Sequence, residues 1–134
     1  MRSGRTTAAP SRGYAPPGWP VPVRPPGCVD WERSAVAFLF DCCPADYRGY
    51  PVLRRHPAVL AGFATAYVEA QVRADAEALA GLRVSLETVA PPEVIQAAVE
   101  AWQEQSARLR RTLREIGLVE EALRGRVFVP RLGT

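Results

Sequence analysis

The side chains best suited to chemistry gather in one stretch, residues 41–56, which reads DCCPADYRGYPVLRRH. It holds two adjacent cysteines, Cys42 and Cys43, and the only histidine of the chain, His56. A cysteine attacks a substrate when a histidine takes its proton, and thiolate and imidazole also bind zinc. Two hypotheses follow: a small enzyme that uses Cys42 or Cys43 with His56, and a metal site that adds Asp46.

Spacing argues against both hypotheses. Structural zinc sites favour cysteines that stand two or more residues apart, and adjacent cysteines rarely point at one ion. A nucleophilic pair also needs a group that orients the base and a donor for the oxyanion, and the sequence indicates neither. The commoner roles are a small buried hydrophobe for Cys43 and a helix-entry residue for His56. We therefore expect no catalytic residue, no metal and no cofactor.

The same stretch is rich in arginine and tyrosine, which suit a different chemistry. Guanidinium groups bind phosphate through two hydrogen bonds, and tyrosine rings stack on bases. Two arginines further along the chain extend the set, because the helical pattern returns to this stretch. The candidate partner- or anion-binding residues are Tyr47, Arg48, Tyr50, Arg54, Arg55, His56, Arg108 and Arg111. The simpler alternative is that these arginines pair with acidic residues close in sequence, such as Asp41, Asp46 and Glu115.

The charge balance gives little support to nucleic-acid binding. The net charge is +3, but residues 1–29 hold four arginines and no acidic residue. Residues 30–134 are close to neutral, with 13 of the 17 arginines against 14 acidic residues. Nucleic-acid binding depends on clustered positive charge rather than on an average, so it is possible but not favoured.

Residues 1–29 are rich in proline, glycine and arginine. Proline fixes φ and has no N–H to donate, so neither a helix nor a sheet extends through such a segment. We expect a disordered tail over 1–29, with Trp19 as the side chain in it best suited to docking. Residues 30–134 would then form a single helical domain with one modest core.

Apolar periodicity predicts an all-α fold for this domain. The expected elements are a short N-terminal helix over 31–42, a long antiparallel helical hairpin over about 57–89 and 92–116, a short C-terminal helix over 118–124, and an extended arm over 127–132. Asp30 suits the N-cap of the first helix. Pro91 and Pro92 make the turn of the hairpin, and Gly117 is read as a C-cap. The segment 44–56 is expected to be a connector.

The hairpin has a predicted register and one weak point. With the turn near residues 90 and 91, the predicted facing pairs are Trp102 with Leu79, Leu109 with Val72, and Leu113 with Val68. Gly81 costs about 1 kcal/mol relative to alanine inside a helix. Because the apolar rhythm continues on both sides of Gly81, we expect the helix to continue through it, with a break there as the alternative.

The predicted hairpin is longer than anything available to cover it. At 1.5 Å per residue, the helix over 31–42 spans about 18 Å and the first long helix roughly 50 Å. The end near the turn would therefore expose apolar side chains: Leu82, Leu86, Val89, Val94, Ile95 and Val99. Exposed apolar patches mark association surfaces, so we expect a homodimer that forms a four-helix arrangement there. In the competing arrangement, the arm over 127–132 folds back over this patch.

Composition also indicates a compartment. No apolar run is long enough to span a membrane, and no hydrophobic segment of a signal peptide follows Met1. An odd count of three cysteines without CxxC spacing fits a reducing cytoplasm. All 17 basic residues are arginine, which indicates a bacterial gene rich in G and C.

These patterns predict a cytoplasmic, non-enzymatic helical interaction or adaptor protein. It would self-associate through the turn end and bind an unknown protein partner through the arginine and tyrosine side chains. The alternatives are a protein that binds nucleic acid or a phosphoryl ligand through those same side chains, and the small enzyme that uses cysteine and histidine.

Overall fold

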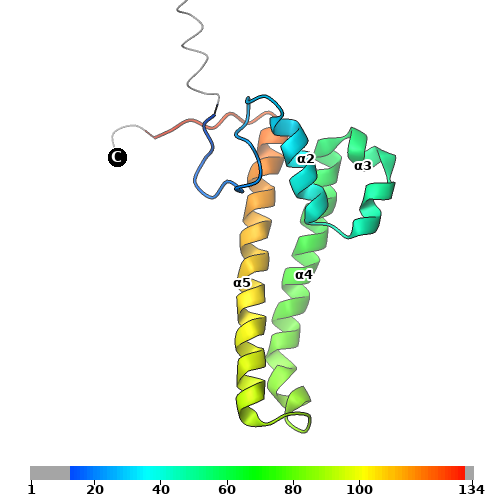
Figure 1. Ribbon diagram of the computed structural model, residues 1–134, viewed down its shortest axis with the longest axis vertical. Helices are drawn as coiled ribbons and strands as arrows, with labels where there is room; N and C mark the ends of the chain where they lie inside the picture. Colours follow the sequence, from blue (N-terminus) through cyan, green and yellow to red (C-terminus); the bar gives the residue numbers. More distant parts are fainter. Residues whose placement is uncertain (1–12, 132–134) are drawn as a thin grey trace, which may run out of the picture.

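The computed structural model describes residues 13–131, and within that range the chain is helical and contains no strand. The elements are α2 (Trp31–Asp41), the 3₁₀ helix η2 (Ala45–Gly49), α3 (Pro51–Arg55), α4 (Pro57–Leu86) and α5 (Pro92–Leu123). The helices α4 and α5 run antiparallel as one long hairpin, and the shorter elements gather at its open end (Figure 1). The prediction of an all-α fold is confirmed. None of the described helices is both long enough and apolar enough to cross a membrane.

The first long helix, α4, keeps its predicted start but ends early. It begins with Pro57 at its first position and runs unbroken through Gly81, as expected. It ends at Leu86 rather than at Val89, and a turn over residues 87–89 leads to the two prolines. The N–H groups of Val89 and Ala90 bond to the carbonyl oxygen of Leu86 at 2.8 and 3.2 Å, which closes the final turn.

The predicted helix end at Gly117 is wrong, because α5 continues to Leu123 and includes the predicted C-terminal helix. Ile116 and Val119 are completely buried on either side of Gly117, so the apolar rhythm of α5 passes through the glycine. Burying these two side chains outweighs the cost of about 1 kcal/mol for a glycine inside a helix. The residue that follows the helix end in the left-handed conformation is Gly125, with φ of 100°.

The register of the hairpin is visible in two hydrogen bonds near its middle. The indole N–H of Trp102 donates to the backbone oxygen of Asp75 at 3.0 Å. The hydroxyl of Ser106 donates to the Asp75 carboxylate at 3.4 Å. Trp102 therefore contacts α4 one helical turn away from its predicted neighbour, Leu79.

The main core lies at the open end of the hairpin, where α2 packs against α4 and α5. Its largest completely buried side chains include Leu39 of α2, Leu60 of α4 and Ile116 of α5. The predicted connector over 44–56 is more regular than expected, since it contains η2 and α3. Leu53 of α3 is completely buried, and its burial holds this segment against the core.

The N-terminal segment differs from the predicted disordered tail over residues 13–29. Trp19 lies against Trp31 and Phe128, with ring centroids 6.4 and 6.0 Å apart, and donates its indole N–H to the backbone oxygen of Val23 at 2.9 Å. Val23 itself is buried. Proline is compatible with this packing because successive turns need few backbone N–H donors, and aromatic contacts replace a ladder of hydrogen bonds. Residues 1–12 of the predicted tail lie outside the described residues.

Two predictions about the ends of the domain also change. Asp30 has a left-handed backbone, with φ of 66°, and its side chain makes no cap hydrogen bond to α2. The C-terminal arm forms no strand as far as Arg131 and lies at the open end of the hairpin, where Phe128 is buried beside Trp19 (Figure 1). Over its described residues the arm therefore does not cover the turn end, and Leu132 lies outside them.

Candidate functional site

The cysteines and the histidine lie at opposite ends of α2. His56 and Glu32 line one shallow pocket near the start of that helix. Cys42 and Cys43 follow its other end, roughly 15 Å further along the axis at 1.5 Å per residue. Burial raises the pKa of the Cys42 thiol to about 12, and burial also raises the pKa of Cys43. A nucleophilic cysteine needs the opposite shift.

Metal ligands do not gather in the described part of the chain. Over residues 13–131, no group of three or more histidine, cysteine, aspartate or glutamate side chains is placed to hold an ion. The three cysteines are free thiols. Among them Cys43 is buried, which fits its predicted role as a small hydrophobe.

Two of the predicted anion-binding arginines contact the ring of Phe40. The guanidinium carbons of Arg48 and Arg54 lie 5.6 and 5.4 Å from the ring centroid. Arg48 also pairs with Asp41 at 2.7 Å, and Arg54 donates to the backbone oxygen of Arg48 at 2.7 Å. Each cation–π contact of this kind contributes about 0.5–1 kcal/mol at an exposed site. These arginines therefore hold η2 and α3 against α2, and the predicted alternative of pairing with Asp41 applies to Arg48.

The other predicted arginines are dispersed. Arg55 lines the shallow pocket beside His56, whereas Arg111 lines a separate pocket with Trp19 and Arg114. Arg108 is exposed on α5. Among the described residues no hydrogen bond or ion pair joins Arg108 or Arg111 to the connector. Anion binding at a single arginine cluster stays a prediction, and the contacts do not assemble that cluster.

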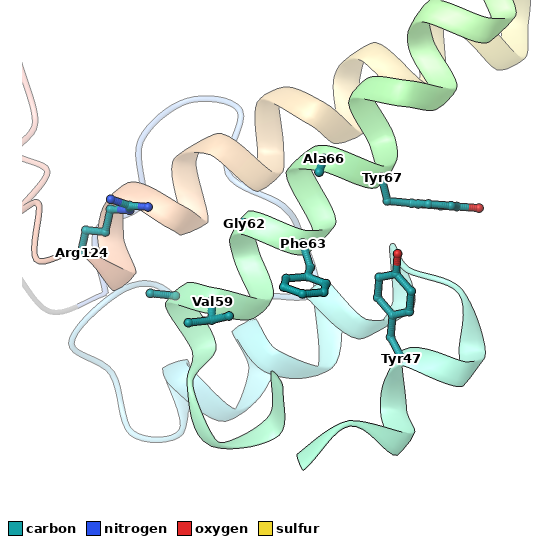
Figure 2. A pocket seen from close by; sticks show the side chains of 8 residues that line it. Tyr47, Val59, Gly62, Phe63, Ala66, Tyr67 and Arg124 are labelled. Carbon is teal, nitrogen blue, oxygen red and sulfur yellow. The ribbon is translucent and has the colours of Figure 1, made fainter. Parts of the chain in front are cut away.

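A shallow apolar groove runs along the outer side of α4, which we call the α4 groove. Its volume is about 890 Å³, and it is lined by Tyr47, Ala58, Val59, Gly62, Phe63, Ala66, Tyr67 and Arg124. Figure 2 shows Tyr47 of η2 facing Phe63, with Tyr67 beside them and Arg124, which directly follows α5, beyond the other end of the groove. Arg124 pairs with Glu120 at 3.0 Å, so the groove has an apolar floor and one polar end.

Aromatic side chains form one wall of the α4 groove. The Tyr47 ring lies edge-on to Phe63 and Tyr67, with centroids 5.9 and 6.3 Å apart, and lies tilted 6.2 Å from Tyr50. Phe63 is 45% exposed and Val59 is 42% exposed. Clustered exposed aromatic residues with a neighbouring arginine are typical of protein interfaces. The arrangement therefore favours binding of another protein surface.

Sequence reasoning selected two members of this wall, Tyr47 and Tyr50, but missed the groove itself. It named neither Phe63 nor Tyr67 as a binding residue. The signal that would have found the groove is the presence of apolar residues on more than one side of this helix. Val59 and Phe63 are four residues apart and lie on the side away from the fully buried Ala61 and Ala64.

The predicted self-association residues divide into three groups by their burial. Ile95 and Val99 are only 7% and 6% exposed, so they are buried in the hairpin rather than available to a partner. Leu82 and Leu86 are half-buried, whereas Val89 and Val94 are exposed. The difference arises because the seam between α4 and α5 continues close to the turn and takes up the inward-facing side chains.

The turn end still carries exposed apolar surface. Val84, which was not predicted, is 71% exposed on α4. Figure 1 shows that the lower half of the hairpin consists of two helices, while α2, α3 and the N-terminal segment lie at the other end. The described residues thus offer two apolar surfaces, the α4 groove and the turn end. Comparison of this chain with protein families, with curated proteins and with solved structures gave no match.

Proposed function

We propose that this protein is a non-enzymatic helical interaction protein that self-associates through the turn half of its hairpin, residues 72–109. The observation that carries the proposal is the exposure of Val84 on α4, Val89 in the turn and Val94 on α5, at 71, 72 and 50%, where no other described element packs. Burying one valine side chain completely contributes about 1.5 kcal/mol. Several such exposed side chains at one end of the molecule favour association.

A second copy of the chain fits this surface by its architecture. Two helical hairpins pack readily into a four-helix arrangement, and two-fold symmetric dimers are the commonest oligomers. In the alternative arrangement, the C-terminal arm would cover the turn end, but its residue Phe128 lies at the opposite end of the hairpin. Its position therefore supports an external partner for the turn half.

The adaptor role would use the surface around η2 and α3 for a further partner. The exposed Tyr50 and Val52 extend apolar surface on that side of the molecule. We place the protein in a cytoplasm, since three free cysteines fit a reducing compartment.

Light scattering coupled to size-exclusion chromatography tests self-association of the full chain. Val84→Glu should lower the measured mass from that of a dimer to that of a monomer, because it places a charge on the proposed interface. Val21→Glu is the matched control, since Val21 is 97% exposed on the N-terminal segment, and it should leave the mass unchanged. A wild-type chain that stays monomeric at all concentrations would contradict the proposal.

A further inference from the structure

The outer side of α4 carries a second helical repeat, separate from the one that faces α5. The positions recur at alternating spacings of four and three residues, so that each position returns after seven. They are Val59, Phe63, Ala66, Ala70, Arg73, Glu77, Ala80 and Val84, and all of them are exposed. A seven-residue repeat with two apolar positions is typical of the seam of a coiled coil. Helix α4 therefore has two seams, of which α5 fills one.

The outer seam is apolar except at its centre. Arg73 and Glu77 occupy successive seam positions there, with two alanines on one side and Ala80 and Val84 on the other. In the described part of the chain neither side chain takes part in an ion pair. A charge buried in a helical seam is costly unless an opposite charge faces it. A helix that packs on this seam must therefore present an acid opposite Arg73 and a base opposite Glu77.

We propose that the occupant of this outer seam is α4 of a second copy, packed antiparallel about a two-fold axis at the level of Asp75. This inference rests on the proposed self-association and names the surface that the turn half binds. In antiparallel packing, a seam position that is followed by a four-residue step faces a seam position that is followed by a three-residue step. Arg73 of each copy then faces Glu77 of the other, which supplies both required charges from one sequence.

The remaining layers of the seam are also complementary. Ala66 faces Val84 of the second copy, and Ala70 faces its Ala80. In the two layers furthest from the axis, the larger Val84 lies opposite the smaller Ala66, which lets the helices approach without a void. The exposed Val84 and the exposed α4 groove, which includes Ala66, thereby cover each other.

Other pairings of the same two helices leave the charges unsatisfied. Parallel packing places Arg73 against Arg73 and Glu77 against Glu77, and like charges in contact are unfavourable. An antiparallel register shifted by seven residues places Arg73 against Ala70, so neither charge has an opposite charge facing it in the second copy. The central pair therefore selects one orientation and one register.

The charge of the two halves of the molecule supports the same arrangement. In the turn half, the acidic residues Asp75, Glu77, Glu87, Glu93, Glu100 and Glu104 outnumber the arginines Arg73, Arg83 and Arg108. Outside the turn half, residues 13–71 and 110–131 hold 11 arginines against eight acidic residues, although Arg124 in the lining of the α4 groove is itself paired with Glu120. Antiparallel packing brings the acidic turn half of one copy, with Glu87 just beyond Val84, over the groove of the other. Opposite potentials on facing surfaces fix orientation.

A charge-reversal experiment tests the central pair. Arg73→Glu alone should bring two carboxylates face to face across the seam, and Glu77→Arg alone should bring two guanidinium groups together, so each variant should be monomeric by light scattering. An equimolar mixture of the two variants should form a heterodimer, because each chain then offers the charges that the other lacks. Arg110→Glu, which makes the same charge change at an exposed position of α5 outside the turn half, is the control and should stay dimeric. Circular dichroism confirms that each variant is helical.

Cysteine cross-linking gives an independent readout of the register. Mixing Ala66→Cys with Val84→Cys under mild oxidation should give a disulfide-linked heterodimer, with the wild-type chain as the control for its native cysteines. A Val89→Cys homodimer formed instead would indicate contact from turn to turn and would overturn the antiparallel seam. A dimeric wild type whose charge-reversed variants fail to associate on mixing would also overturn it, while leaving self-association intact. A monomeric wild type would contradict the proposed function itself.

Discussion

The indole nitrogen of Trp102 lies 3.0 Å from the backbone carbonyl oxygen of Asp75 and donates a hydrogen bond to it. One helical turn further along α5, Ser106 donates to the carboxylate of the same residue at 3.4 Å. These contacts fix how α5 lies along α4 in a region that α2 does not reach. Asp75 lies between Arg73 and Glu77 in the sequence. The contacts of α4 with α5 therefore fix the part of α4 that carries these two charges on its outer side.

Substitutions at Trp102 should separate its hydrogen bond from its packing. Trp102→Phe keeps most of the ring but removes the donor, so it should lower the free energy of unfolding by about 1 kcal/mol. Trp102→Ala should lower it by about 3 kcal/mol, near the lower end for a large aromatic residue because the side chain is half-buried. Urea unfolding followed by circular dichroism measures both. Equal effects of the two substitutions would contradict this division.

Trp19 should hold the N-terminal segment onto the open end of the hairpin. Trp19→Ala removes its contacts with Trp31 and Phe128, so it should lower the free energy of unfolding by about 3 kcal/mol. It should also speed proteolysis within residues 13–29. Val21→Ala is the control, because Val21 is 97% exposed, and it should change stability by less than about 0.5 kcal/mol. If the two variants resist protease equally, the anchoring role is wrong.

Two glycine substitutions should have opposite signs. Gly117→Ala should raise the free energy of unfolding by about 1 kcal/mol, since the glycine lies inside a helix and an added Cβ meets nothing within 4 Å. Gly18→Ala should lower it by about 1–2 kcal/mol, because Gly18 has φ of 88° and alanine is strained there. Chemical denaturation of the two variants checks the pair. Stabilisation by Gly18→Ala would show that the N-terminal segment is not held in this conformation.

Stability should fall in alkaline solution through Cys42. Burial raises the pKa of its thiol to about 12, above the ordinary value of 9.0. As pH rises above 9, the unfolded chain loses this proton while the folded chain keeps it, so ionisation favours unfolding. The contribution is fully present below pH 9 and is lost as the pH approaches 12. Urea midpoints at about pH 8 and about pH 10.5 should differ less in Cys42→Ala than in the wild type. An identical difference in both proteins would exclude this cause.

The long helices could be predicted from the sequence because their signals are local and repeated. The apolar rhythm continues on both sides of Gly81, and it correctly predicted an unbroken α4. The same reasoning failed at Gly117, where the glycine was read as a helix end although the apolar pattern continues beyond it. Burial of Val119 decides that position, and burial depends on the helices that surround it.

The packed N-terminal segment and the α4 groove could not be predicted for a related reason. Trp19 is held by Phe128, which lies at the other end of the sequence, so no local pattern indicates that contact. Phe63 belongs to a helix with apolar residues on two sides, and the sequence alone does not indicate which side faces the core. The contacts of Arg48 and Arg54 with the ring of Phe40 could not be predicted either, because the spacing of these residues does not indicate them.

Sedimentation equilibrium of the full chain over a hundredfold range of concentration tests self-association most directly. The hairpin account predicts a mass that rises with concentration towards twice the 14.6 kDa of one chain. The rise should follow mass action for a single monomer–dimer equilibrium. A mass that stays at 14.6 kDa throughout the range would contradict it.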